Sequence, residues 1–259
     1  MRLGFVGTGA ITSAIVAGLN AAGIGRDTIL VSPRNAETAA ALAARFSSVT
    51  VAASNQAVLD GSDVVMLAVR PQVATEVLSE LKFRADHHVI SLMAIMPLEQ
   101  VRAMVAPASK VTRAIPLPTV ADRRGPTVIF PPDPGAVAIF DRLGTTIAAT
   151  SADQFGAFSA ATATMAPYFA FAGEIAGWLE RHGVPAHVAR TYVATVLQGL
   201  ADTAVREKEL SFAALAGEFA TRGGINEQVA GHLKQHGALA ALSDALDAVL
   251  QRMKAAARD

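Results

Sequence analysis

The chain has 259 residues, of which 52% are hydrophobic, and its 22 basic and 22 acidic residues give a formal net charge of zero. Bulk charge therefore offers no attraction for nucleic acid, and no apolar stretch is long and uninterrupted enough to cross a membrane. The sequence contains no cysteine, which excludes disulfides, thiolate metal sites and a cysteine nucleophile. Because the apolar run Leu3–Val6 is too short for a signal peptide, we expect a soluble, cytoplasmic protein of one large or two modest domains.

The N-terminal residues combine a strand, a glycine turn and a helix start. The apolar run Leu3–Val6 leads into Gly7-Thr8-Gly9, and a helical pattern follows at once from Ala10 and Ile11. The first glycine permits a tight turn, and the second lets the backbone approach a phosphate without a Cβ in the way. The free N–H groups of the helix start then face the anion. This arrangement is typical of a dinucleotide pyrophosphate site, although Thr12 occupies the third position of the motif, where Gly or Ala is usual.

Strand and helix patterns alternate as far as Thr150. The predicted strands are Leu3–Val6, Thr28–Ser32, Val49–Ala52, Val64–Ala68, His88–Leu92 and Lys110–Ala114. The predicted helices between them are Ala10–Ala22, Ala36–Phe46, Asn55–Leu59, Val73–Leu81 and Pro97–Val105. Thr127–Phe130, the helix Asp133–Leu143 and Thr146–Ala149 extend this sheet beyond its six-strand core. The alternation predicts an α/β fold with a Rossmann-type doubly wound parallel sheet in residues 1–150.

The pattern after Thr150 is helical throughout. The predicted helices are Asp153–Arg181, a helix from Pro185 to about Lys208, Phe212–Phe219 behind the N-cap Ser211, Asn226–Gln235 and Ala238–Ala257. Residues 151–259 therefore form a second, all-helical domain. Because these helices are too apolar to stand alone, we expect a homodimer, or a higher homo-oligomer, built through them.

The end of the second predicted strand distinguishes between NAD and NADP. An NAD site usually has an acidic residue here, but the chain continues Ser32-Pro33-Arg34-Asn35. Without a carboxylate nothing repels a 2′-phosphate. The hydroxyl of Ser32 and the planar guanidinium of Arg34 are suited to bind that group. The sequence thus favours NADP(H), with an ordinary solvated Arg34 as the alternative.

Further cofactor contacts are expected at the carboxyl edge of the sheet. Val69, Arg70 and Pro71 follow the buried strand Val64–Ala68, and ligands of such folds lie along this edge. Asn55 begins the helix after the third strand. It either reaches the adenosine side of the cofactor or acts as a simple N-cap.

Three segments of the chain resemble the pyrroline-5-carboxylate reductase family, the NADPH-dependent enzymes of proline biosynthesis. They are Gly4-Phe5-Val6-Gly7-Thr8-Gly9, Ser32-Pro33-Arg34-Asn35 and Ala68-Val69-Arg70-Pro71-Gln72, the last close to the family's Ala-Val-Lys-Pro-Gln. The pair Gly223-Gly224 falls where the family has a glycine pair in its last substrate loop. The resemblance implies a Rossmann domain, a helical dimerisation domain and hydride transfer to a small C=N substrate. It also implies that the partner subunit completes the pocket.

The substrate half departs from the family in three segments. Leu117, after Pro116, stands where the family has the asparagine of Met-Pro-Asn-Thr-Pro. The family's Ser-Gly-Ser-Gly-Pro-Ala-Tyr is replaced by the bulkier Ala163–Phe169 segment, and its Pro-Gly-Gly-Thr-Thr by Arg222–Asn226. Because a pocket that hydrogen-bonds a polar group discriminates strongly, these joint changes predict a C=N or C=O substrate that is larger or less polar than pyrroline-5-carboxylate.

Candidate site residues lie in these departing segments. The catalytic candidates are Thr164, Tyr168 and Asn226, although a tyrosine in an alanine-rich helix often serves packing alone. The substrate-binding candidates are Pro116, Leu117, Pro167, Arg222, Gly223 and Gly224. His232 and His236 have helical i, i+4 spacing but no nearby acid or third ligand, so no metal site is expected.

Two other functions stay open. A β-hydroxyacid-type dehydrogenase would share the two-domain plan, but the chain lacks a lysine where such an enzyme places its catalytic base, and Gly223-Gly224 also counts against it. A non-catalytic protein that senses NADPH would equally explain the loss of the polar substrate contacts. Binding of NADPH without turnover would favour the sensor.

Overall fold

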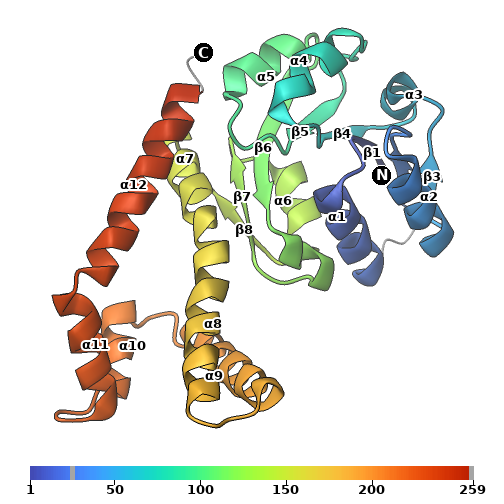
Figure 1. Ribbon diagram of the computed structural model, residues 1–259. Coiled ribbons are helices and arrows are strands. Elements are labelled where there is room, and N and C mark those ends of the chain that lie inside the picture. Colours follow the sequence, from blue (N-terminus) through green and yellow to red (C-terminus); the bar gives the residue numbers. More distant parts are fainter. Residues whose placement is uncertain (24–26, 257–259) are drawn as a thin grey trace. The chain divides into compact units, whose positions relative to one another are not determined.

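The computed structural model describes residues 1–23 and 27–256 (Figure 1). The chain divides into two compact units. The first comprises Met1–Ser159 together with the end of the chain from Arg252, and the second comprises Ala160–Gln251.

The first unit is built on an eight-stranded sheet (Figure 1). Its strands are β1 (Arg2–Val6), β2 (Thr28–Val31), β3 (Val49–Val51), β4 (Val64–Leu67), β5 (His88–Ser91), β6 (Lys110–Pro116), β7 (Pro126–Phe130) and β8 (Thr145–Ala148). They lie in the order β3-β2-β1-β4-β5-β6-β7-β8, and β1 to β6 are parallel. β7 runs antiparallel to β6, and β8 runs parallel to β7. The predicted doubly wound fold and its extension are confirmed.

Helices cover both faces of this sheet. They are α1 (Ala10–Ala21), α2 (Ala36–Arg45), α3 (Asn55–Asp60), α4 (Pro71–Ser79), α5 (Leu98–Met104), the 3-10 helix η1 (Pro118–Asp122), α6 (Pro134–Phe140) and α7 (Ala152–Ala161). α4 begins two residues before the predicted Val73, because a proline is well placed at a helix's first position, where its missing N–H is not needed. β6 also continues past the predicted Ala114 to Pro116.

Alternating side chains of the strands divide the core between two faces. Phe5 packs on the face that α1, α2 and α6 cover, with Leu19 and Phe140. Its neighbour Val6 packs on the opposite face with side chains of α3, α4 and α5, such as Leu78. Because successive strand residues point to opposite faces, a sheet covered on both sides needs continuous apolar strands. The two cores hold the carboxyl ends of the strands in fixed positions.

The second unit is helical. It contains the 3-10 helix η2 (Thr162–Thr164), α8 (Met165–Arg181), α9 (Ala186–Arg206), α10 (Phe212–Phe219), α11 (Ile225–Gln235) and most of α12 (Ala238–Ala256). The N-cap at Ser211 is confirmed, since its Oγ accepts a hydrogen bond from the N–H of Ala214 at 3.1 Å. Ala257, the predicted last residue of the final helix, lies outside the described residues.

The single helix predicted over Asp153–Arg181 is wrong. The chain instead forms α7, then η2, then α8. Pro167 lacks an N–H, and its ring clashes with the carbonyl that lies four residues earlier in a continuous helix. The turn before it therefore tightens to a 3-10 helix, and α8 starts with Pro167 in its first turn.

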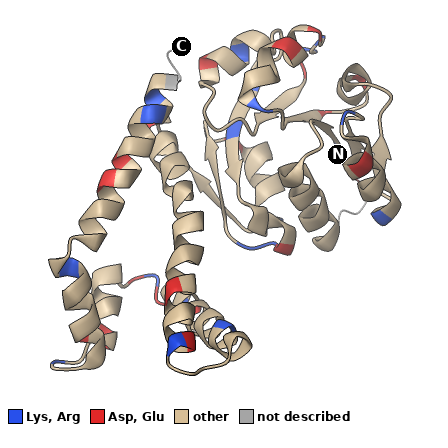
Figure 2. Ribbon diagram, viewed as in Figure 1, with Lys and Arg blue, Asp and Glu red and all other residues tan. Residues whose placement is uncertain are grey.

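The helices of the second unit leave many large apolar side chains exposed. The most exposed of them are Phe169, Val205, Phe212 and Ile225. Charged residues are sparse along α8 and α9, as Figure 2 shows. Such a surface is typical of a region that another protein chain covers. None of the helices in the described ranges has the length and apolar character needed to cross a bilayer.

His87 is buried just before β5, and we expect it to lower the free energy of unfolding in mild acid. Its Nδ1 accepts a hydrogen bond from the N–H of Arg84 at 3.0 Å, so its Nε2 donates to the carbonyl of Leu59 at 3.0 Å. These contacts require the neutral ring, and burial lowers the pKa of His87 below its usual 6.5; burial likewise lowers the pKa of His88. As the pH falls below 6.5, the unfolded chain takes up protons on these histidines that the folded chain does not. The free energy of unfolding should therefore fall.

Urea unfolding between pH 7.5 and 5.5 measures this effect, and stability should be lower at the acidic end. His87→Gln serves as the control, because its amide is able to donate to the same carbonyl without titrating. A variant whose stability varies with pH as steeply as the parent protein's would contradict the assignment.

Candidate functional site

The turn after β1 has a backbone that requires glycine. Gly7 has a φ of 102°, and a Cβ placed on it would lie 2.5 Å from the carbonyl oxygen of Ala68. Gly9 has an ordinary φ of −104°, and a Cβ there would have no atom within 4 Å. The first glycine is therefore required by the fold, while the second leaves a space open for a ligand.

Three hydroxyl groups frame this turn. The N–H of Gly7 donates to the Oγ of Ser32 at 2.9 Å, and the Oγ1 of Thr8 donates to the carbonyl of Ser32 at 2.7 Å. On the other side, the Oγ1 of Thr12 donates to the carbonyl of Gly7 at 2.8 Å. The residue that departs from the glycine motif thus closes the turn through its side chain.

The first turn of α1 provides free backbone donors. The first helical hydrogen bond runs from the N–H of Ser13 to the carbonyl of Gly9, so the amides of Ala10, Ile11 and Thr12 precede the helical ladder. The first turn carries no acidic residue. Ala10 is exposed, whereas the side chain of Ile11 packs against the core. Such a helix start attracts an anion.

A hollow of about 450 Å³ opens beside the turn. It is lined by Gly7, Thr8, Gly9, Arg34, Asn35, Val69, Arg70 and Val73. Arg34 and Arg70 are exposed, and in the part of the chain that the structure describes neither forms an ion pair. The side chain of Asn35 caps α2 by accepting from the N–H of Thr38 at 3.4 Å. The hollow therefore combines an open glycine, a positive helix end and two available guanidinium groups, a set that fits a phosphorylated dinucleotide.

The other cofactor candidates lie around this hollow. Ser32 is fully buried behind the turn. Pro71 is the first residue of α4, directly after Arg70. Asn55 is the first residue of α3, and the N-cap is Ser54, whose Oγ accepts from the N–H of Ala57 at 3.1 Å. The capping alternative for Asn55 is therefore wrong, and its contact with the adenosine stays a prediction.

The edge of the sheet next to β6 holds two substrate candidates and one residue that the sequence did not single out. Pro116 ends β6 and is buried, and Leu117 leads into η1. Arg113 lies within β6, where its Nη2 donates to the carbonyl of Ala94 at 2.6 Å and its guanidinium carbon is 4.2 Å from the ring centre of Phe155. Burial lowers the pKa of Arg113 to about 10. The signal in the sequence was a charged residue in the middle of a buried strand, whose other charge, Lys110, lies at its exposed start.

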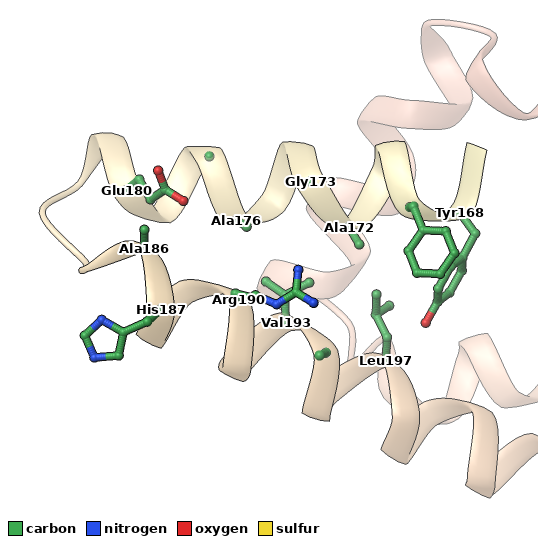
Figure 3. Close-up of a pocket in the computed structure, with 13 residues that line it drawn as sticks. Tyr168, Ala172, Gly173, Ala176, Glu180, Ala186, His187, Arg190, Val193 and Leu197 are labelled. Carbon is green, nitrogen blue, oxygen red and sulfur yellow. The ribbon is translucent and has the colours of Figure 1, made fainter. Parts of the chain in front are cut away.

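Three candidates lie at the start of α8. The Oγ1 of Thr164 donates to the carbonyl of Ala161 at 2.8 Å, and Pro167 is exposed. Tyr168 is 47% exposed, and its ring meets that of Phe169 edge to face at 5.2 Å. A groove of about 600 Å³ lies between α8 and α9. Figure 3 shows Tyr168 at one end of this groove and Arg190 pointing into it.

The loop before α11 holds the remaining candidates. Gly223 has a φ of 73°, and its N–H donates to the Oε2 of Glu227 at 2.7 Å, while Gly224 is the N-cap of α11. Arg222 is exposed. The Nδ2 of Asn226 donates to the carbonyl of Phe219 at 2.9 Å, and Asn226 lines a separate hollow between α9 and α10. Within one chain, therefore, Tyr168 and Asn226 line different hollows and are not brought together.

The glycine turn follows β1, and its neighbour in the sheet is β4. The strand order reverses between these two strands, and ligands of doubly wound sheets bind at such a point. With its hollow and its two free arginines, the first unit defines the chain as a dinucleotide-binding protein of the Rossmann class.

Comparison with known proteins shows which family of dinucleotide-binding proteins the chain resembles. Residues 2–95 match the family described as "NADP oxidoreductase coenzyme F420-dependent", and residues 152–256 match "Pyrroline-5-carboxylate reductase dimerisation". The chain is 28% identical to pyrroline-5-carboxylate reductase of Pseudomonas aeruginosa over 50% of this chain and 48% of that protein. It is 28% identical to pyrroline-5-carboxylate reductase 3 of Xenopus laevis over 76% of this chain and 75% of that protein.

The structure of a pyrroline-5-carboxylate reductase from Coxiella burnetii matches with a TM-score of 0.85 and 25% identity, covering 98% of this chain and 97% of that one. The chain therefore resembles pyrroline-5-carboxylate reductases, and its helical unit matches their dimerisation domain. The chain spans about half the length of the first curated relatives that it matches.

Proposed function

We propose that this chain is an NADPH-dependent reductase that transfers hydride to the C=N or C=O group of a small molecule. The observation that carries the proposal is the hollow at the glycine turn, with Arg34 and Arg70 free beside it and no acidic residue among its lining residues. The similarity of the chain to pyrroline-5-carboxylate reductases supports the same hydride transfer.

Different residues of the first unit bind different groups of the proposed cofactor. The N-terminus of α1 and Arg70 hold the pyrophosphate, while Arg34 binds the 2′-phosphate as a planar, bidentate donor. Val69 lines the hollow directly after β4, next to β5 in the sheet, so it would contact the cofactor along this edge. The bound cofactor supplies the hydride.

The protein must also bind the substrate, exclude water and supply a proton. Pro116 and Leu117 provide an apolar wall at the same edge of the sheet. In the second unit, the hydroxyl of Tyr168 and the amide of Asn226 are the proton-donor and substrate-orienting candidates. Since one chain places them in different hollows, we propose a homodimer through the helical unit, in which the partner subunit completes the pocket. A cytoplasmic location stays a prediction.

The substrate is proposed to be less polar or larger than pyrroline-5-carboxylate. Leu117, Ile225 and Asn226 stand where the resemblance places an asparagine amide and two threonine hydroxyls. Ile225 is 80% exposed on α11 and presents an apolar surface instead. Such an exchange favours apolar substrate groups.

Oxidation of NADPH by the purified protein tests the proposal, with pyrroline-5-carboxylate, larger apolar cyclic imines and keto acids as substrates. We expect an apolar imine to be reduced at a rate on the order of 10 per second, and pyrroline-5-carboxylate more slowly. Faster reduction of pyrroline-5-carboxylate would contradict the substrate assignment. Binding of NADPH without turnover of any substrate would instead indicate a non-catalytic sensor.

A further inference from the structure

Ser32 follows β2, and each of its polar groups is bonded either to β1 or to the glycine turn that follows it. Its N–H donates to the carbonyl of Phe5 at 3.0 Å, and its carbonyl accepts from the Oγ1 of Thr8 at 2.7 Å. Its Oγ accepts from the N–H of Gly7 at 2.9 Å and lies 3.1 Å from the Oγ1 of Thr8. The residue therefore joins the end of β2 to the turn between β1 and α1.

These contacts leave Ser32 unsuited to bind a phosphate. It is fully buried, and it is not among the residues that line the hollow. A hydroxyl has one proton and two lone pairs, and the two neighbours of this oxygen already engage it. Arg34, two residues later, is exposed and lines the hollow directly.

Thr12 holds the same glycine from the opposite side. Its hydroxyl donates to the carbonyl of Gly7, so the two backbone polar groups of Gly7 are bonded by the side chains of Thr12 and Ser32. Gly7 has a positive φ, and glycine adopts many backbone conformations at little cost, so bonds to both of its polar groups restrict the turn to one of them. The two hydroxyls thus keep the turn in the shape that admits a phosphate.

We propose that Ser32 and Thr12 are positioning residues that set the shape of the glycine turn, and that Ser32 is not a contact of the 2′-phosphate. The inference rests on the dinucleotide binding proposed above. When only a fraction of molecules has the competent turn, the apparent affinity falls by that fraction. Because the pyrophosphate is common to NADPH and NADH, losing either hydroxyl weakens both cofactors by the same factor.

Titration of the full-length protein with NADPH and with NADH tests this inference in four variants. Ser32→Ala and Thr12→Val should each raise both dissociation constants by roughly tenfold and leave their ratio unchanged. Arg34→Ala should weaken NADPH alone. Ser32→Cys, which keeps the side-chain shape with a weaker acceptor, should cause a smaller, equally uniform loss.

Ser62→Ala is the matched control. Its buried Oγ donates to the carbonyl of Val58 at 2.6 Å, at the other end of the sheet, so its removal should lower the melting temperature but neither affinity. Selective loss of NADPH in Ser32→Ala would make Ser32 a phosphate contact, and unchanged affinities would remove both hydroxyls from the mechanism. Either result overturns the inference. Failure of the unsubstituted protein to bind either cofactor would instead contradict the proposed function.

Discussion

Gly7→Ala is expected to lower the free energy of unfolding by about 2–4 kcal/mol, because it adds backbone strain and a steric clash. The residue has a φ of 102°, which a side chain disfavours, and the new Cβ would lie 2.5 Å from the carbonyl oxygen of Ala68. That oxygen belongs to the backbone after β4 and has little freedom to move. Thermal or urea unfolding measures the loss.

Gly9→Ala, two residues later, is expected to fail in binding and not in folding. Its φ of −104° suits alanine, and the added Cβ meets no atom of the protein within 4 Å. Stability should remain within about 0.5 kcal/mol of the parent protein's. The methyl group occupies the space through which the phosphates approach, so the affinity for NADPH should fall by about 10- to 100-fold. Parent-like binding in Gly9→Ala would place the pyrophosphate elsewhere, and parent-like stability in Gly7→Ala would contradict the geometry of the turn.

The sheet was predictable because its strands are covered on both faces. All four residues of β4 are apolar and buried, and such a short apolar run between helical patterns indicates a parallel strand. The direction of β7 was not predictable, because the side-chain pattern of a strand is the same in either direction. The break at η2 depends on a single proline inside an otherwise continuous helical pattern.

The site was predictable to the extent that it depends on chain order. The glycine turn and Arg34 lie next to each other because adjacent parallel strands end at the same edge. The orientation of Ser32 depends on Gly7 and Thr8, more than twenty residues away, so its burial was not visible in the sequence. Thr12 resembled a defect in the motif, and only its contact with the carbonyl of Gly7 explains it.

The double substitution Ile225→Thr with Asn226→Thr is expected to shift substrate preference towards pyrroline-5-carboxylate. It restores the two hydroxyls that the resemblance assigns to binding the substrate's imine and carboxylate. Ile225 is 80% exposed at the start of α11, so the shorter side chain loses little packing. The ratio of kcat/KM for pyrroline-5-carboxylate to that for an apolar imine should rise by about 10- to 100-fold.

Val229→Thr is the control for this substitution, since it makes a similar exchange at an exposed position one turn further along α11. It should leave the ratio unchanged, and neither protein should bind NADPH differently, because the cofactor hollow lies in the first unit. An equal shift in both variants would mean that general polarity of the helix is responsible. No shift in the double variant would mean that Ile225 and Asn226 do not select the substrate. A pocket that hydrogen-bonds a polar group rejects substrates lacking it more strongly than an apolar pocket rejects an added polar group, so the gain should come mainly from reduced turnover of the apolar imine.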